Sequence, residues 1–207
     1  MIPPATALET NHTTQWFRRP KTWVVLAGIL LRRADRPVVI WSGACSTGEE
    51  AYSAAILLDM IQVAGRVLAA DVDRDVVAHA RAGRYHVGVQ GAGDIQGLDL
   101  TPWLERDSPG YAKVHAGIAS KVDFSVRDLR EPAAVPARCD VAIVRNVWRY
   151  LSPDEQAGLA HRIAASLTPG GVLVLGGSDK TLPGMIPPSA VAQLFVEGTG
   201  GIWQRKE

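Results

Sequence analysis

A short apolar run, followed by a glycine-containing turn and a helical pattern, constrains the fold of this chain more than any other feature. The run Val38–Trp41 has the length and the β-branching of a buried strand in a parallel sheet. The turn Gly43–Gly48 follows, and apolar residues then recur at helical spacing from Glu49 to about residue 64. This order is the first half of a βαβ unit, which places the turn at the carboxyl end of a parallel strand.

The same alternation continues along the chain and predicts a doubly wound α/β sheet with right-handed crossovers. Four more apolar runs predict strands at residues 67–70, 122–126, 140–144 and 172–175, the last of them preceded by a turn at Pro169–Gly171. Further helices are predicted at residues 21–33, at residues 74–82 and from Ser152 onward, where Ser, Pro and Glu have the spacing of a capping box.

Three segments fall outside this alternation. Residues 1–20 are polar and are predicted to form an arm in front of one domain at residues 21–207. Residues 84–120 are glycine-rich and weakly patterned, which predicts an irregular cap within that domain. The tail predicts a hairpin, with strands at residues 192–197 and 202–205, that would add antiparallel edge strands to the sheet.

Composition removes several classes of function. The net charge is +1 over 207 residues, so no global attraction to nucleic acid or anionic membrane is expected. No apolar run of about 18 residues occurs, and the first 20 residues lack the features of a secretory signal. Cys45 and Cys139 are too few for a disulfide scaffold, and no Cys/His cluster has metal-binding spacing. We therefore expect a cytoplasmic protein with reduced thiols and no metal.

The turn at residues 43–50 indicates which ligand the sheet binds, because ligands of open α/β sheets lie beyond the carboxyl ends of the strands. It resembles the phosphate loop G-x-x-x-x-G-K-[ST], but Glu49 and Glu50 stand in place of Lys and Ser or Thr. Carboxylates at a helix start repel phosphate, although they also suit a purely helix-stabilising role. Asp71, at the end of the second strand, is placed like an acid that binds ribose. A ligand that carries a ribose and positive charge but no phosphate fits both features, and S-adenosylmethionine is such a ligand.

Five segments in the same order resemble the CheR-type chemotaxis receptor methyltransferases, a family of protein-glutamate methyltransferases. The segment WSGACSTGEEAYSAAILL resembles the family's first motif, and the others are TTQWFRRP, LAADVDRDVVAHARAGRY, CDVAIVRNVWRYLSPDEQ and LTPGGVLVLGGSD. The resemblance implies the class I methyltransferase fold, a Rossmann-like, doubly wound sheet of seven mostly parallel strands with an antiparallel C-terminal hairpin. It also implies S-adenosylmethionine as cofactor and S-adenosylhomocysteine as product.

The resemblance implies which residues bind this cofactor. Glu50 would hold the methionyl end, Asp71 would bind the ribose, and Asp128 and Leu129 would flank the adenine. The full implied set is Thr14, Ala44, Glu50, Asp71, Asp128, Leu129, Arg145 and Asn146.

For the acceptor, the resemblance implies Arg18 and Tyr150 as catalytic residues that face the transferred methyl group. A carboxylate acceptor is already ionised at neutral pH, so it needs alignment and removal from water rather than a general base. An arginine suits this task because its planar fork holds a carboxylate in a fixed pose. The implied acceptor-binding set is Trp16, Arg18, Trp148, Arg149 and Tyr150.

Several positions depart from the family pattern. The family typically carries a basic helical domain before its T-x-F-F-R stretch, which starts here near residue 14, and we expect this chain to lack that domain. His12, Arg19 and Ala51 replace the family's usual Asn, acidic residue and Pro. Three functions therefore stay open. The chain could methylate a carboxylate-bearing protein, or it could bind the donor without catalysis. It could also methylate a small metabolite in a closed pocket lined by Trp16, Trp148, Arg149 and Tyr150. The oligomeric state also stays open.

Overall fold

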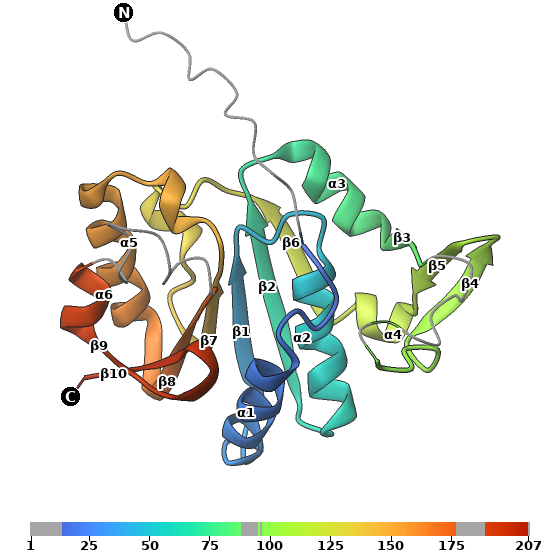
Figure 1. Cartoon of the computed structure of the whole chain (residues 1–207), viewed down its shortest axis with the longest axis horizontal. Helices are drawn as coiled ribbons and strands as arrows, with labels where there is room; N and C mark the ends of the chain where they lie inside the picture. Colours follow the sequence, from blue (N-terminus) through green and yellow to red (C-terminus); the bar gives the residue numbers. More distant parts are fainter. Residues whose placement is uncertain (1–13, 88–94, 96, 177–188, 207) are drawn as a thin grey trace, which may run out of the picture.

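The structure, a computed structural model, describes residues 14–87, 95, 97–176 and 189–206. Its main element is a seven-stranded sheet with the order β6-β2-β1-β7-β8-β10-β9 (Figure 1). The first five strands of this order are parallel, whereas β10 runs antiparallel to both β8 and β9. The predicted doubly wound sheet with a reversed end is confirmed. The strands are β1 (Val38–Gly43), β2 (Gly65–Asp71), β6 (Val122–Val126), β7 (Cys139–Val144), β8 (Leu167–Leu175), β9 (Phe195–Glu197) and β10 (Ile202–Arg205).

Successive strand residues point into two different hydrophobic cores, one on each face of the sheet. Ile40 and Val141 belong to the core that α1, α2 and α3 cover, and Trp41 and Ala142 belong to the core that α5 and α6 cover. Figure 1 shows the two sets of helices on either side of the central strands. The helices are α1 (Pro20–Leu31), α2 (Glu49–Met60), α3 (Arg74–Ala82), α4 (Ala116–Ala119), α5 (Pro153–Ser166) and α6 (Ser189–Leu194).

The helix ends follow the capping chemistry of the sequence. The Ser152 side chain accepts a hydrogen bond from the backbone of Glu155, whose carboxylate accepts one from the Ser152 backbone, so the predicted capping box is present. Gly83 ends α3 in the left-handed conformation. Helix α1 starts one residue before the predicted position, and α2 ends at Met60 rather than near residue 64. These helices bring the loop before α2 to the carboxyl edge of the sheet.

The prediction of an irregular cap at residues 84–120 was wrong. Three strands, β3 (Arg84–His86), β5 (Tyr111–Val114) and β4 (Leu104–Ser108), form a separate antiparallel sheet in the order β3-β5-β4. They are short, β4 exposes three of its five residues, and its pairing with β5 contains a register shift, so no clear alternation marks them. In Figure 1 this small sheet extends away from the main sheet near the end of α3. Residues 88–94 and 96 of the predicted cap lie outside the described residues.

The predicted terminal hairpin is present but shorter than expected. Residues 192–194 belong to α6, and only Phe195–Glu197 forms a strand beside β10. The predicted turn at Pro169–Gly171 lies inside β8, where the pairing with β7 shifts register. Gly170 adopts a φ of 67° at this point, a backbone conformation that glycine takes without strain.

Candidate functional site

The loop between β1 and α2 is shaped by left-handed backbone conformations. Ala44 and Ser46 have φ angles of 59° and 51°, and Gly48 has a φ of 97°. A Cβ atom at Gly48 would lie 2.8 Å from both the Ala80 Cβ atom and the Tyr85 hydroxyl, so only glycine fits here. The loop is thus a strained, closely packed turn at the edge of the sheet where ligands bind.

Asp71, the last residue of β2, holds this loop through its carboxylate. One oxygen accepts from the Ser46 backbone N–H at 2.8 Å and the other from the Asp73 backbone N–H at 3.0 Å. Its side chain is buried. A carboxylate offers about four acceptor positions, so about two remain for a ligand. Asp71 can therefore hold the loop and at the same time accept hydrogen bonds from two hydroxyl groups of a ligand.

Glu50 is the centre of a buried polar network that joins three parts of the chain. Its Oε1 atom accepts from Ser42 Oγ at 2.9 Å, and Arg145 Nη1 lies 3.4 Å from its Oε2 atom. Arg145 Nη2 also donates to the backbone carbonyl of Arg18 at 3.1 Å. Burial raises the pKa of Glu50, while Arg145, Ser42 and the charge of Arg18 oppose that shift. Arg145 therefore links β7, the start of α2 and the N-terminal arm.

Three carboxylates lie around the buried Cys45 thiol of the loop. Burial raises the pKa of the Cys45 thiol well above its usual range, and Asp71, Glu50 and Glu49 raise it further. Burial also raises the pKa of Glu49, although the Thr47 hydroxyl donates to its carboxylate at 2.7 Å. Carboxylates at this position attract a cationic ligand and disfavour a phosphate.

The N-terminal arm is anchored to α2. The Phe17 backbone N–H donates to Ser53 Oγ at 2.9 Å. Phe17 and Arg19 adopt left-handed φ angles of 46° and 63°, so the chain turns sharply on either side of Arg18. This turn places Arg18, which is half-buried, close enough for its charge to lower the pKa of Glu50.

Trp16 packs inside the core that lies under the arm. Its ring stacks on Tyr52 with centroids 6.4 Å apart and meets Tyr85 edge-on with centroids 5.1 Å apart. Thr14, the first described residue, is half-buried. The structure thus gives Trp16 an anchoring contact, and the acceptor contact of Trp16 and the cofactor contact of Thr14 stay predictions.

The segment after β7 carries the remaining acceptor candidates. Asn146 has a φ of 63°, and Trp148–Tyr150 forms one turn of 3-10 helix. Trp148 is buried in the α5 core and donates from Nε1 to the Val144 carbonyl at 2.9 Å, whereas Arg149 and Tyr150 are exposed. Trp16 and Trp148 lie in different cores. Among the described residues, the four residues of the hypothetical metabolite pocket therefore do not come together around one cavity.

The loop after β6 holds the two predicted adenine neighbours. Asp128 accepts hydrogen bonds from the guanidinium and the backbone N–H of Arg130, and the side-chain bond lowers the pKa of Asp128. Leu129 is buried, and a Cβ atom at Gly43 would lie 3.2 Å from its side chain. Leu129 thus lies beside the beginning of the β1–α2 loop, whereas the Asp128 carboxylate is occupied by Arg130.

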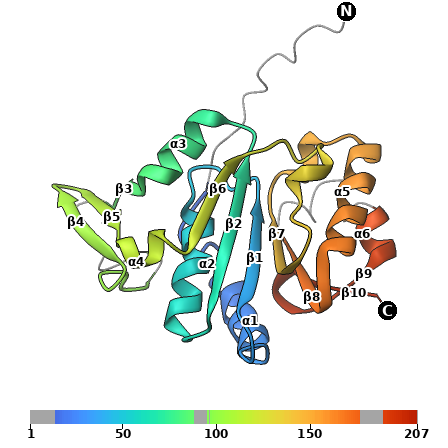
Figure 2. The same cartoon turned by 180° about the vertical axis from the view of Figure 1, so that it is seen from behind.

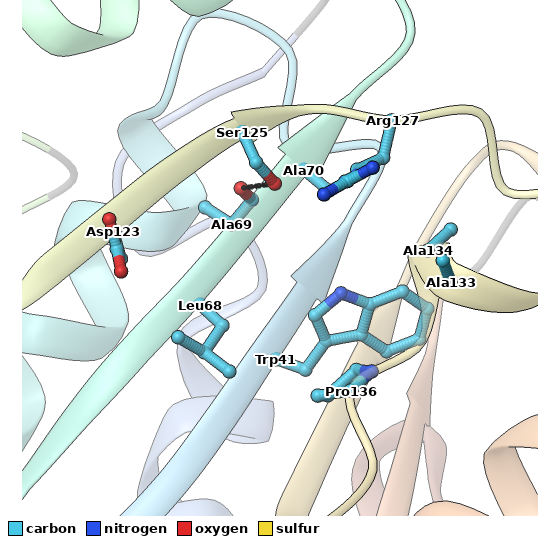
Figure 3. A pocket seen from close by; sticks show the side chains of 10 residues that line it. All are labelled: Trp41, Leu68, Ala69, Ala70, Asp123, Ser125, Arg127, Ala133, Ala134 and Pro136. Carbon is cyan, nitrogen blue, oxygen red and sulfur yellow. Dashed lines mark hydrogen bonds between the residues drawn. The ribbon is translucent and has the colours of Figure 1, made fainter.

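A pocket of about 220 Å³ lies on the sheet face opposite α2, and its walls include Trp41, Ala70, Arg127 and Pro136 (Figure 3). It arises because the β6–β7 connection contains only a 3-10 turn, Pro132–Ala134, where a doubly wound fold usually has a helix. Figure 2 shows β6, β2 and β1 without a described helix in front of them. None of the carboxylates around the β1–α2 loop lines this pocket.

Ser42 and Ser53 were not among the predicted site residues. Ser42 is a polar residue in an otherwise apolar buried strand, and that exception was the available signal for its bond to Glu50. Ser53 lies one helical turn after Glu49 and donates to its carbonyl at 2.7 Å while accepting from the arm. No local pattern indicated the contact with the arm, because the two segments are 36 residues apart.

Two kinds of feature are absent from the described residues, a metal-binding cluster and a membrane-spanning helix. Those residues contain no group of three or more His, Cys, Asp or Glu side chains arranged to hold a metal ion. None of the described helices combines the length and hydropathy that crossing a bilayer requires.

Comparison with known proteins is consistent with this geometry. Residues 12–186 match the family described as "CheR methyltransferase, SAM binding domain". The chain is 33% identical over 188 residues to chemotaxis protein methyltransferase 1 of Vibrio cholerae, covering 84% of this chain and 66% of that protein. It is 35% identical over 177 residues to the chemotaxis protein methyltransferase of Salmonella typhimurium, covering 82% and 61%. The chain thus spans less than two thirds of the length of each of these relatives.

Among solved structures, TrmN from Thermus thermophilus superposes with a TM-score of 0.47 at 20% identity, covering 91% of this chain and 51% of that chain. This likeness is too weak to bear on function.

Proposed function

The chain belongs to the CheR methyltransferase family, and from that premise we propose that it transfers a methyl group from S-adenosylmethionine to a carboxylate. The observation that carries this proposal is the network in which Arg145 contacts both Glu50 and the backbone of Arg18. It joins the predicted methionyl-binding carboxylate to the arm that carries the predicted acceptor-facing arginine. The proposed cofactor-binding residues are those implied by the sequence, with Ser42 added as the partner of Glu50.

The described side chains fit this cofactor in charge and in hydrogen-bonding capacity. Glu49, Glu50 and Asp71 bring three carboxylates to the crevice, and Arg145 and Arg18 bring two guanidinium groups. The crevice thus favours a ligand with net positive charge, as a sulfonium amino acid has. The two open acceptor positions of Asp71 match the two hydroxyl groups of a ribose.

When bound, the cofactor supplies a methyl group on a positively charged sulfur, and transfer to a carboxylate oxygen leaves a neutral thioether and a neutral ester. No proton moves, so the chain needs no general base. The proposed task of Arg18 is to hold the acceptor carboxylate in line, because its charge is near enough to Glu50 to lower the pKa of that carboxyl group. The tight turn around Arg18 limits the positions that this side chain can reach, which favours alignment.

We propose that the acceptor carboxylate belongs to a protein. The relatives named above are chemotaxis protein methyltransferases, which favours a protein glutamate over a metabolite. Arg149 and Tyr150 are exposed rather than enclosed in a pocket, and an open surface suits a macromolecular acceptor. We also propose a cytoplasmic location, which agrees with the two free, buried cysteines.

Calorimetric titration with S-adenosylhomocysteine tests the cofactor part of the proposal. We expect binding in the micromolar range, and Asp71→Ala should weaken it by about 10- to 150-fold, the worth of charge-assisted hydrogen bonds. The absence of any heat at millimolar ligand would contradict the proposal. Unchanged affinity in Asp71→Ala would remove Asp71 from the ribose role.

A second measurement separates catalysis from binding alone. The chain is incubated with methyl-labelled S-adenosylmethionine and a glutamate-containing acceptor protein, and the product is treated with base. A carboxyl methyl ester releases labelled methanol in base, whereas an N-methyl or C-methyl product does not. Binding without any transferred label would favour the non-catalytic module.

A further inference from the structure

Tyr85 connects the small sheet to the loop between β1 and α2. It belongs to β3, where it pairs with Ala112 of β5, and it is 3% exposed. Its hydroxyl donates a hydrogen bond to the backbone carbonyl of Thr47 at 2.7 Å. The small sheet extends away from the main sheet in Figure 1, but this side chain reaches back to the loop at the ligand-binding edge. One residue of the small sheet thus contacts the backbone of the candidate site directly.

The Tyr85 ring is enclosed by other aromatic rings, so its hydroxyl has a fixed position. Trp16 meets it edge-on with ring centroids 5.1 Å apart, and Tyr52 and His79 do so at 6.0 Å and 5.5 Å. Burial raises the pKa of Tyr85 far above its usual range, and the charge of Glu49 raises it further. The hydroxyl therefore keeps its proton and acts as a hydrogen-bond donor throughout the neutral range.

The Thr47 carbonyl lies next to the loop residue that Asp71 holds. Asp71 accepts from the Ser46 backbone N–H, so two consecutive loop residues are tethered, one from β2 and one from the small sheet. The loop needs such tethers because Ala44 and Ser46 adopt left-handed φ angles. Non-glycine residues persist in this conformation only where the surrounding structure holds them there. The bond from Tyr85 is one of the contacts that can do so.

The two tethers differ in what a bound donor would require of them. Asp71 is the proposed ribose ligand, so its carboxylate would be shared between the loop and the donor. The bond from Tyr85 to Thr47 would keep the loop in place while Asp71 is shared. Thr47 also lies just before α2, so the same bond fixes the position of the helix start that carries Glu49 and Glu50.

We propose that Tyr85 is a positioning residue of the donor site, whose hydroxyl holds the β1–α2 loop in the conformation that binds S-adenosylmethionine. This inference rests on the proposed function. Tyr85 acts through the Thr47 carbonyl and needs no contact with the donor itself. Loss of the hydroxyl should therefore weaken donor binding by loosening the loop.

Tyr85→Phe removes the hydroxyl alone, and Tyr52→Phe is the matched control. The Tyr52 hydroxyl belongs to the same aromatic cluster but donates to the Ala80 carbonyl of α3, at 2.9 Å. Each variant loses one buried hydrogen bond, so each melting temperature should fall by about 2–4 °C. Calorimetric titration with S-adenosylhomocysteine should show binding about three- to tenfold weaker in Tyr85→Phe and within about twofold of the unmodified chain in Tyr52→Phe. Equal affinities in the two variants would overturn the proposal.

Amide hydrogen exchange, followed by NMR, tests the same inference without any ligand. The Ser46 backbone N–H is bonded to Asp71, and the Gly48 backbone N–H is bonded to the Cys45 carbonyl at 3.1 Å. Both amides should exchange at least about threefold faster in Tyr85→Phe than in the control variant. If the unmodified chain binds no S-adenosylhomocysteine, the proposed function fails, whereas this measurement still decides whether Tyr85 holds the loop. Equal exchange in the two variants would overturn the inference even where the donor binds.

Discussion

The proposed donor side and the proposed acceptor side of the crevice lie at the same edge of the sheet but are built differently. On the donor side, Asp71 is fixed by two backbone N–H groups and Glu50 by Ser42 and Arg145, all of them buried. On the acceptor side, Tyr150 is 38% exposed and belongs to a single turn of 3-10 helix. The proposed donor side is therefore prearranged by the fold, whereas Arg149 and Tyr150 of the proposed acceptor side lie on an open surface.

This difference corresponds to what each side has to recognise. A cofactor of fixed shape is bound best by groups whose positions are determined before it arrives. A protein acceptor brings its own surface and needs only a few anchoring side chains at the entrance. The arm connects the two proposed sides, because the Arg18 backbone accepts from Arg145 while its side chain is the proposed acceptor-binding group. Substitutions on the donor side should therefore change stability and donor affinity, whereas substitutions on the acceptor side should change turnover.

The largest effect is expected from Arg145→Leu, which removes the cation from the donor side. Glu50 would then be a buried carboxylate without its ion-pair partner, a change that typically costs about 3–5 kcal/mol. In a chain of this size, the melting temperature should fall by roughly 10 °C. Binding of S-adenosylhomocysteine should be lost as well, because both Glu50 and the arm are displaced. Thermal unfolding and calorimetric titration measure the two effects.

The pH dependence of Arg145→Leu provides its control. Burial already raises the pKa of Glu50, and the loss of Arg145 raises it further. The folded state then holds a proton that the unfolded chain releases near pH 4.3. Stability of the variant should therefore be highest below that pH and fall as the pH rises through the raised pKa. The double variant Glu50→Gln/Arg145→Leu should lose this pH dependence. If the single variant were equally stable at pH 5 and pH 8, Glu50 would not be the group that Arg145 neutralises.

A smaller and more selective effect is expected from Arg18→Ala. The backbone carbonyl that accepts from Arg145 is kept, so the arm should stay docked and donor affinity should change by less than about threefold. Turnover should fall by about 10- to 150-fold, because a charge-assisted contact to the acceptor is lost. Measurement of turnover and of donor affinity on the same preparation checks the split. An equal loss of both would place the Arg18 side chain on the donor side and remove the distinction between the two sides.

The main sheet could be predicted from sequence because its strands are buried on both faces and read as apolar runs. The small sheet β3-β5-β4 could not, since its strands are short and partly exposed, the β4–β5 pairing shifts register, and the β3–β5 pairing joins segments more than 20 residues apart. The boundary at residues 192–194 was also wrong, because an apolar segment next to a strand can extend either as strand or as helix. Tertiary packing decides such cases.

The carboxylates of the crevice could be predicted because a glycine turn after a strand fixes their place in the fold. The partners of those carboxylates could not, since Ser42 and Arg145 reach Glu50 across 8 and 95 positions of sequence. Burial of Trp16 and Trp148 was also beyond the sequence pattern, because an aromatic residue next to a site can line a pocket or fill a core. The structure resolves that choice through ring packing and indole hydrogen bonds.

The smallest effect is expected from Asp128→Asn, which removes the charge of this predicted adenine neighbour and keeps its size. The Asp128 carboxylate is occupied by Arg130, and that bond keeps its pKa low, so the side chain stays ionised throughout the neutral range. Because Arg130 is more than half exposed, the ion pair is worth at most about 1 kcal/mol. Donor affinity should therefore change by less than about fivefold, and it should not vary between pH 6 and pH 8 in either form. Calorimetric titration at both pH values checks this. A much larger loss would show that Asp128 contacts the donor directly, and the prearranged donor side would then extend to the loop after β6.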